Sequence, residues 1–246
     1  ESLGKITGML TQAPVDFAAL TKAVKTSLRD MDVVPNKLFS KGDGVPDLNP
    51  DRIYFEGTSL GGFTGAVFTG ALPAKVEGVV YQVGGSSVIN TLDESILWPG
   101  ILVLPGIRDL VADNAGPGDA AALVSMAQHL VDLGDPINYA HRVRERNIPT
   151  LLLYADQDPI VTNPGSEAYM RVAELPIYGT MYHAVADLPG QTAARPTNGF
   201  AATQLYTKDI QWLPDPVSLT LHLTFARPYA IEEMRGYLDD RLRAND

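Results

Sequence analysis

The sequence holds 246 residues, which is long enough for one α/β domain with a sizeable core. Its 19 Lys and Arg against 29 Asp and Glu give a net charge of −10, which argues against a general nucleic-acid binder and against electrostatic docking to anionic lipid. Disulfides, thiolate catalysis and cysteine-ligated metals are excluded within the chain because it has no cysteine. No uninterrupted apolar stretch approaches the roughly 20 residues of a membrane-spanning helix. The start at Glu1, without a signal peptide or initiator Met, is consistent with a processed or truncated product.

Elements in the first third of the chain alternate between helix and strand. Apolar residues at helical spacing predict an amphipathic helix over 14–30, and a loop rich in Gly, Asp, Pro and Asn follows over 41–50. The next elements, in chain order, are a strand at 52–56, a glycine-rich turn at 57–62, a helix at 63–71 and a buried strand at 76–83.

The remainder of the chain begins with a long segment, 86–147, that lacks strand patterning. Within it an apolar stripe that includes Leu123 and Leu130 predicts a helix, with Asp119 as N-cap and Gly134 as C-terminal stop. The later elements are a strand at 148–154, a helix at 166–174, a strand at 200–206 and a helix from about 228 to 242. Strands that alternate with helices predict an α/β fold with a mostly parallel sheet.

Gly57-Thr58-Ser59-Leu60-Gly61 matches the pattern G-x-S-x-G at the point where a strand passes into a helix. A serine in this context sits on a sharp, strained turn, and its hydroxyl is presented above the sheet edge. We expect Gly57 and Gly61 to be required, because side chains there would collide at the turn. The helix offers N-terminal amides to an anion, so the Leu60 amide is a candidate oxyanion donor. The alternative is a glycine-rich turn whose Ser59 only caps the helix.

A catalytic serine needs a base, and the base needs an orienting acid. Two acids, Asp156 and Asp158, directly follow the strand at 148–154. We favour Asp158, because one further turn beyond the strand end points back over the sheet, whereas Asp156 is more typical of a loop or cap residue. The alternative for Asp158 is a turn residue before Pro159.

The base must come from the four histidines. We favour His222, because a loop between the last strand and the last helix would bring its imidazole over the nucleophile. His183 is the second candidate, and it also follows the acid and precedes the last helix. A half-buried strand histidine is the alternative interpretation of His222. We expect His129 and His141 at the surface.

These segments together resemble a known superfamily. Gly-Thr-Ser-Leu-Gly-Gly after Arg-Ile-Tyr-Phe-Glu, and then Leu-Leu-Leu-Tyr-Ala-Asp-Gln-Asp-Pro-Ile-Val, look like the α/β-hydrolases, and the order Ser, Asp, His agrees with them. The resemblance covers most of residues 50–243 and implies a single α/β-hydrolase domain over 1–246, with a helical cap or lid inserted at 86–147. More narrowly, Asp-Pro-Ile-Asn-Tyr-Ala at 135–140 and the stretch from His222 to Met234 are similar to bacterial extracellular lipases and esterases.

The resemblance implies serine carboxylic-ester hydrolysis without a cofactor, by Ser59, Asp158 and His222, on a small-molecule ester or lipid. It also implies a secreted or cell-surface location. Such enzymes carry a second oxyanion donor, usually His-Gly-like, on a loop after an earlier strand, and nothing before Ser59 matches it. We therefore expect either that a separate N-terminal segment completes the sheet, or that the sheet is reduced and the oxyanion hole unusual.

The loop from Lys41 to Asp51 is the one candidate for a metal. Asp43, Asp47, Asn49 and Asp51 are oxygen ligands at alternating spacing, as Ca²⁺ prefers, and the sequence resembles short calcium-binding Asp/Gly repeats. Only one copy occurs, however, and the EF-hand pattern is absent. We favour a plain Asp/Gly/Pro turn.

The apolar segment from Ile96 to Ile107 contains Trp98 and several aliphatic residues. It suits either a pocket for hydrophobic acyl chains or the small core of a cap.

Three functional hypotheses follow. The first is a serine esterase or lipase that acts through an acyl-serine on esters with apolar acyl groups. The second is a non-catalytic hydrolase-fold binding module, favoured by the missing upstream strands and the two candidate histidines. The third is a peptidase or acyltransferase with the same triad, which the motif does not separate from an esterase because all proceed through an acyl-serine.

Overall fold

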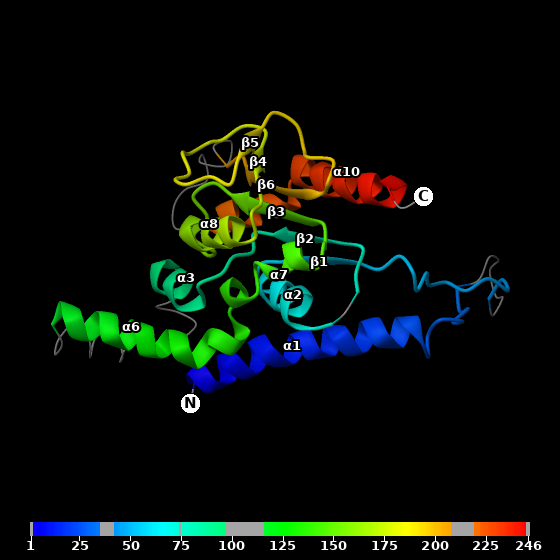
Figure 1. Ribbon diagram of the computed structural model, residues 1–246, viewed down its shortest axis with the longest axis horizontal. Helices are drawn as coiled ribbons and strands as arrows, with labels where there is room; N and C mark the ends of the chain where they lie inside the picture. The colour runs from blue at the N-terminus through cyan, green and yellow to red at the C-terminus, as the bar shows by residue number, and fades with distance from the viewer. Residues whose placement is uncertain (1, 35–41, 74, 97–115, 208–218, 245–246) are drawn as a thin grey trace.

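A six-stranded sheet forms the centre of the molecule. The computed structural model describes residues 2–34, 42–73, 75–96, 116–207 and 219–244. The strands lie in the order β1-β2-β3-β6-β4-β5, and every neighbouring pair is parallel. Helices lie on both sides of the sheet, as Figure 1 shows. The predicted α/β fold class, a mostly parallel sheet flanked by helices, is confirmed.

The strands are short, and the central ones are buried on both faces. Their bounds are β1 Tyr54–Thr58, β2 Gly78–Gln82, β3 Thr150–Ala155, β4 Ile177–Tyr178, β5 Gln191–Thr192 and β6 Phe200–Leu205. The four longer strands correspond to the predicted ones, with β1 shifted two residues toward the C-terminus. The two-residue strands β4 and β5 were not predicted, because a periodic signal needs a longer run.

The helices alternate with these strands. They are α1 Ser2–Lys25, α2 Leu60–Ala71, α3 Val88–Glu94, α6 Pro117–Val131, α7 Arg142–Glu145, α8 Asn163–Val172, α9 Leu219–His222 and α10 Pro228–Ala244, with short 3₁₀ turns at Asp132–Gly134, Pro136–Asn138 and Leu223–Ala226. Among the described residues, no helix combines the length and the apolar character that crossing a membrane requires.

The helix predicted over 14–30 is wrong at both ends. Helix α1 begins at Ser2, continues through Pro14 and ends at Lys25. Proline in a helix interior removes one backbone hydrogen bond, and Gly4 and Gly8 are weak helix formers, so local propensity does not reveal the first half. Tertiary packing stabilises the helix instead, because Leu10 is buried and the Phe17 ring packs at a tilt against Phe55, with ring centroids 5.3 Å apart.

Residues of the central strands alternate between two cores, as the pleat requires. Leu152 of β3 faces the core under α2 and α8, together with Phe68 and Tyr169. Its neighbours Leu151 and Leu153 face the opposite core, which α10 covers with Ala230 and Tyr237. Helices on both faces exclude water from a parallel sheet and so stabilise it.

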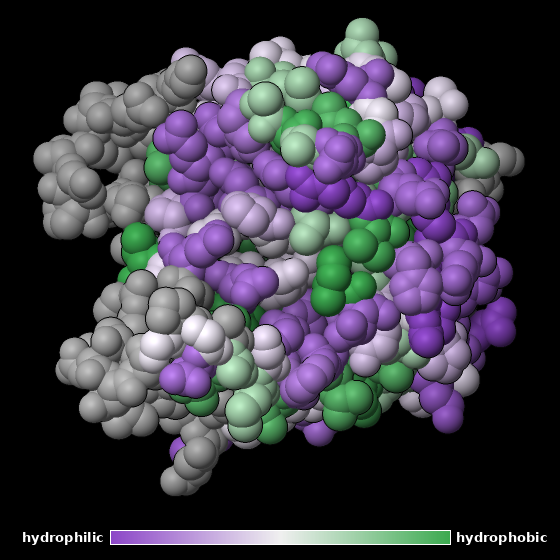
Figure 2. Space-filling view, turned by 60° about the vertical axis from the view of Figure 1, so that its left-hand side comes forward, coloured by the Kyte–Doolittle hydropathy of each residue, from purple (hydrophilic) through white to green (hydrophobic). Residues whose placement is uncertain are grey.

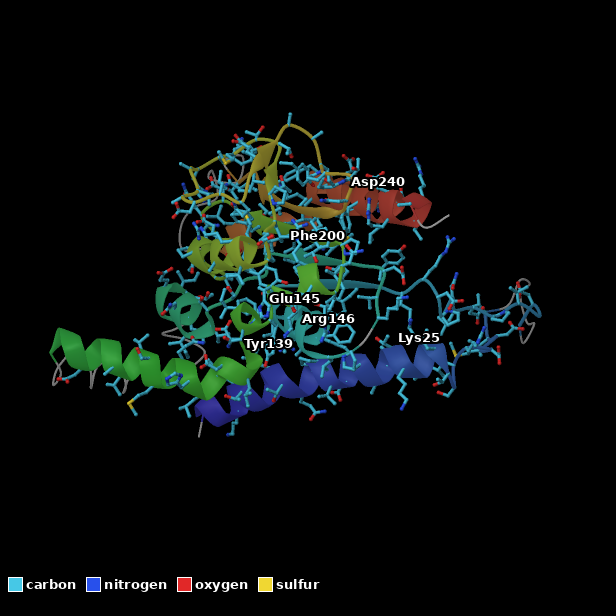
Figure 3. All side chains as sticks on the ribbon, viewed as in Figure 1. Lys25, Tyr139, Glu145, Arg146, Phe200 and Asp240 are labelled. Atoms are coloured by element: carbon cyan, nitrogen blue, oxygen red, sulfur yellow. The ribbon has the colours of Figure 1, made fainter. Side chains whose placement is uncertain are left out.

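The connection between β2 and β3 contains only helices and turns within its described residues. It packs against α2, where Gly70 makes room for Tyr139: a Cβ at Gly70 would lie 2.5 Å from the Tyr139 Cβ. Arg146 donates hydrogen bonds to the carbonyls of Thr69 and Leu72 at the end of α2. Tyr139 and Arg146 are labelled beside α2 in Figure 3. The assignment of 86–147 as a cap stays a prediction, because residues 97–115 lie outside the described ranges.

Asp119 and Gly134 differ from their predicted roles in this connection. Helix α6 begins at Pro117, with Gly116 as N-cap, and Asp119 instead accepts a hydrogen bond from the Gly116 amide at 3.2 Å. The α-helical part ends at Val131 and passes through a 3₁₀ turn to Gly134. A Cβ at Gly134 would lie 2.4 Å from the Cβ of Leu10, so this glycine permits close packing on α1.

A buried carboxylate holds the start and the end of this connection together. Asp135 is fully buried and accepts hydrogen bonds from the amides of Ser87 (2.9 Å), Val88 (2.7 Å) and Ile137 (3.0 Å) and from Gln128 Nε2 (2.8 Å). Four donors around one carboxylate compensate the loss of its hydration. The residues after β2 are thereby fixed to those before β3.

Replacement of Asp135 by Asn should destabilise the protein by about 2–3 kcal/mol, because the amide nitrogen would face backbone donors instead of accepting from them. Urea denaturation followed by circular dichroism measures the change. Asp132→Asn is the control, since that side chain is 39% exposed and its loss should cost less than about 1 kcal/mol. Equal stability of the Asp135→Asn and wild-type proteins would contradict the structural role of this carboxylate.

Candidate active site

Ser59 occupies the turn between β1 and α2. Strand β1 ends at Thr58 and α2 begins at Leu60, so one residue makes the whole connection. Ser59 has φ 54° and ψ −117°, a conformation that is strained for any residue other than glycine. Its amide donates to the Gln82 carbonyl at 2.8 Å, and its carbonyl accepts from the Gly62 amide at 2.8 Å. This is the strand–turn–helix geometry predicted from the G-x-S-x-G pattern.

The glycines around Ser59 have different roles. A Cβ at Gly57 would lie 2.3 Å from the Gly61 carbonyl oxygen, so position 57 must be glycine for the turn to close. The expectation that Gly61 is also required is wrong, because a Cβ there would have no atom within 4 Å. Gly62 is the second constrained position: its Cβ would lie 2.9 Å from the Gly84 Cα after β2. Of these two glycines, at which a side chain would clash, the G-x-S-x-G motif includes only Gly57.

His222 lies within hydrogen-bond distance of the Ser59 hydroxyl. Its Nε2 is 2.8 Å from Ser59 Oγ, although the two residues are 163 positions apart. His222 ends the short helix α9 just before α10, so it is helical rather than part of a strand. The imidazole is only 7% exposed, and the Phe225 ring lies edge-on to it at 6.3 Å.

Asp158 lies behind the imidazole, in the loop that follows β3. Its Oδ2 is 2.7 Å from His222 Nδ1, and its Oδ1 accepts from the amides of Ile160 (2.8 Å) and Val161 (3.1 Å). The side chain is 1% exposed. Two backbone donors hold the carboxylate in one orientation, and its other oxygen faces the imidazole.

These contacts determine which nitrogen of His222 can accept a proton. When Nδ1–H donates to Asp158, Nε2 presents its lone pair to the Ser59 hydroxyl. The Leu60 amide lies in the first turn of α2, where amides have no acceptor within the helix and the dipole favours negative charge. The arrangement can deprotonate a serine and stabilise an oxyanion beside it.

His183, the second candidate base, occupies a separate cluster. Its Nδ1 is 2.7 Å from Asp156 Oδ1 and its Nε2 is 2.7 Å from Glu167 Oε1. Burial alone lowers the pKa of the imidazole, but the hydrogen bonds and negative charges of Glu167 and Asp156 outweigh burial and raise that pKa above its ordinary value. Both ring nitrogens are therefore engaged away from Ser59. Nothing in the sequence pattern predicts that Glu167 contacts His183.

The other two histidines lie at the surface, as predicted. The side chain of His129 is 81% exposed and that of His141 is 49% exposed. Each has an acidic neighbour on its own helix or in the turn that follows it. Their ion-pair contacts are with Asp132 and Glu145 and not with Ser59.

The acidic side chains of the loop before β1 bind backbone amides. Asp47 Oδ2 accepts from Val33 (2.7 Å) and Val34 (3.1 Å), Asp43 accepts from Val45 (3.0 Å) and Asn49 accepts from Asp51 (3.0 Å). The bonds of Asp43 and Asn49, each to the amide two residues on, are those of Asx-type turns, whereas Asp47 ties the loop to the chain after α1. In the part of the chain that the structure describes, no three His, Asp or Glu side chains are grouped as metal ligands.

Strand β1 is the edge of the described sheet. Residues 2–34 and 42–53 contribute a helix and turns but no strand. Within the described ranges no strand precedes β1, so the second oxyanion donor stays an open question of the sequence analysis. The apolar segment from Ile96 to Ile107 was assigned to an acyl pocket or to the core of a cap. Its residues 97–107 lie outside the described ranges.

Comparison with known proteins gives only distant likenesses. No protein-family model matches the chain, and no curated protein matches its sequence. A structure of Pyrococcus horikoshii acylaminoacyl peptidase aligns with a TM-score of 0.43 and 13% identity over 79% of this chain and 25% of that one. A protein of Acinetobacter baumannii, whose assignment as a lipase is itself provisional, aligns with a TM-score of 0.31 and 14% identity over 75% of this chain and 62% of the other. The chain thus spans less than two thirds of either protein.

The two glycines of the motif provide a matched test of the turn. Gly57→Ala should displace the turn and lower reaction at Ser59 by about 10²-fold, since a small misplacement of a reacting group has that effect. Gly61→Ala should keep the wild-type rate and stabilise α2 by roughly 0.5–1 kcal/mol. Labelling of Ser59 by a serine-reactive probe and urea denaturation measure the two effects. Similar behaviour of both variants would contradict this assignment.

Proposed function

We propose that the protein is a serine hydrolase that cleaves carboxylic esters through an acyl-serine intermediate. The observation that carries the proposal is the continuous hydrogen-bonded chain from Ser59 Oγ to His222 Nε2 (2.8 Å) and from His222 Nδ1 to Asp158 Oδ2 (2.7 Å). A strained serine on a strand–helix turn supports it independently, because a turn that only caps a helix needs no base beside its hydroxyl.

The proposed reaction has two halves. Ser59 Oγ attacks the ester carbonyl carbon while His222 Nε2 takes its proton, and the carbonyl oxygen becomes an oxyanion beside the Leu60 amide. When the tetrahedral intermediate collapses, the carbon–oxygen bond to the alcohol breaks and His222 returns the proton to the leaving oxygen. Water then repeats the sequence on the acyl-serine and releases the carboxylic acid. Asp158 keeps the imidazole oriented and stabilises its positive charge.

Apolar side chains around these residues support esters with apolar acyl groups as substrates. Leu60, next to Ser59, is 46% exposed, and Leu223, next to His222, is 49% exposed. Ile96 is 45% exposed and donates its amide to the Pro159 carbonyl, next to Asp158. Figure 2, which brings forward the left-hand side of Figure 1, shows green hydrophobic patches between hydrophilic residues on that side of the molecule.

The proposal includes a second oxyanion donor from a segment outside this sequence. Strand β1 is the edge of the described sheet, so an added strand could pair with it beside Ser59. The loop after such a strand would approach the Leu60 amide from the open side. Full activity is then expected only when that segment is present.

A fluorophosphonate probe should label wild-type protein at Ser59, and Ser59→Ala should abolish labelling because the nucleophile is gone. Asp158→Asn should lower the labelling rate on the order of 10³–10⁴-fold, since the amide favours the wrong tautomer of His222. Mass spectrometry identifies the labelled peptide and gives the rate. His129→Gln, at an exposed histidine, is the control and should react like wild type. Folded wild-type protein that no probe labels would argue for the non-catalytic binding module.

Nitrophenyl esters of increasing acyl length test the substrate class. Each additional buried CH₂ contributes about 0.8 kcal/mol, so kcat/KM should rise from acetate to butyrate and octanoate. Leu223→Ser should reduce this preference, whereas Leu20→Ser, at an exposed position on α1, should leave it unchanged. A rate that is independent of acyl length would contradict the apolar acyl site while leaving the hydrolase assignment intact.

A further inference from the structure

The loop that carries Asp158 is bracketed by two acidic residues that share one histidine. Asp156 lies at the end of β3, just before the loop, and Glu167 lies on α8, just after it. His183 Nδ1 is 2.7 Å from Asp156 and His183 Nε2 is 2.7 Å from Glu167. The imidazole thus closes a ring of contacts around the segment from 156 to 167.

We propose that His183 is a positioning residue for the candidate active site, whose doubly donating imidazole ties both ends of the loop that holds Asp158. The inference rests on the proposed serine hydrolase function, which it deepens by making the same site sensitive to alkaline pH. His183 itself touches neither Ser59 nor His222 in the described contacts. It acts through the loop.

Because Asp156 and Glu167 are largely buried, each carboxylate depends on its contact with His183. The side chain of Asp156 is 1% exposed and that of Glu167 is 12% exposed. A carboxylate removed from water needs a charged or hydrogen-bonding partner. Two carboxylates on either side of one ring are both satisfied only when both ring nitrogens carry a proton. Deprotonation leaves one carboxylate facing a nitrogen lone pair, which repels it.

Three elements place further groups around His183. From β3, Tyr154 lies edge-on to the ring at 6.3 Å, in addition to Asp156. From α8, Arg171 pairs with the second oxygen of Glu167 at 3.1 Å and so orients it. From β6, the neutral Gln204 accepts from the His183 amide (3.2 Å) and donates to its carbonyl (3.1 Å), and its Nε2 lies 3.5 Å from the His183 Nε2.

The sign of the pH dependence follows from the direction of the shift. The pKa of His183 is raised in the folded protein, because the two carboxylates outweigh burial. The tie is therefore fully present below the ordinary histidine pKa of about 6.5 and is lost as the pH rises through the raised value. The fall in the reaction rate of Ser59 at alkaline pH is therefore assigned to deprotonation of His183.

Two variants separate the charge of His183 from its bulk. His183→Gln cannot carry a charge or bridge two carboxylates with two ring donors. His183→Arg keeps a planar cation with several donors and stays charged at every pH of the assay. His129→Gln is the matched control on an exposed histidine whose side chain is 81% exposed. Circular dichroism at each pH establishes that the compared proteins are folded.

The experiment is the rate of fluorophosphonate labelling of Ser59 from about pH 5.5 to about pH 9.5, across the titration range of histidine. Wild type and His129→Gln should lose about 10-fold in rate on the alkaline side, within the range expected for a slightly misplaced catalytic group. His183→Gln should be about 10-fold slower at neutral pH and show no alkaline fall. His183→Arg should keep the higher rate into alkaline pH.

The outcomes separate the two proposals. An alkaline fall in folded His183→Gln that equals the wild-type one would overturn the positioning role and leave the hydrolase standing. If His183→Gln does not fold, an alkaline fall retained in His183→Arg would overturn the role in the same way. Absence of labelling in the wild-type protein at every pH would remove the hydrolase and the positioning role together.

Discussion

The backbone at Ser59 is held in a conformation that costs an L-residue roughly 1–3 kcal/mol, and the neighbouring contacts keep it there. With φ 54° and ψ −117°, the residue turns the chain from β1 into α2 in one step. Hydrogen bonds to Gln82 and from Gly62 fix the peptide groups on both sides. Gly57 lets the Gly61 carbonyl approach where a side chain would stand. The hydroxyl therefore points to one place, and it meets an imidazole there.

The partners of Ser59 arrive from distant parts of the sequence because the sheet is parallel. Loops that follow parallel strands collect at one edge of the sheet, so residues after β1, β3 and β6 meet there. This rule allows the sequence to predict Ser59, Asp158 and His222 as candidates from their positions after strands. His222 is favoured over His183 because it lies between the last strand and the last helix. The apolar runs of β2 and β3 predict the α/β fold class, because strands that are buried on both faces of a parallel sheet are apolar throughout.

Other features depend on contacts that leave no local trace. Helix α1 continues through Pro14 because other elements bury Leu10 and partly bury Phe17. Strands β4 and β5 have two residues each, which is too few for a pattern. The pairing of His183 with Glu167 joins positions 16 residues apart on different elements. Sequence spacing reveals which side chains can carry chemistry, but the neighbours that set their protonation come from tertiary packing.

The position of β1 at the margin of the sheet has a mechanical consequence. On one side, the strand that leads to the serine is anchored to β2, and through it to the remaining four strands. On the other side, no strand pairs with it within the described residues. A rotation of β1 about its junction with β2 would tilt the Ser59 hydroxyl, and it would have to move Phe55, which packs against Phe17 and Phe68. A polypeptide laid along that margin would stiffen the reactive group and shield it from solvent in the same step.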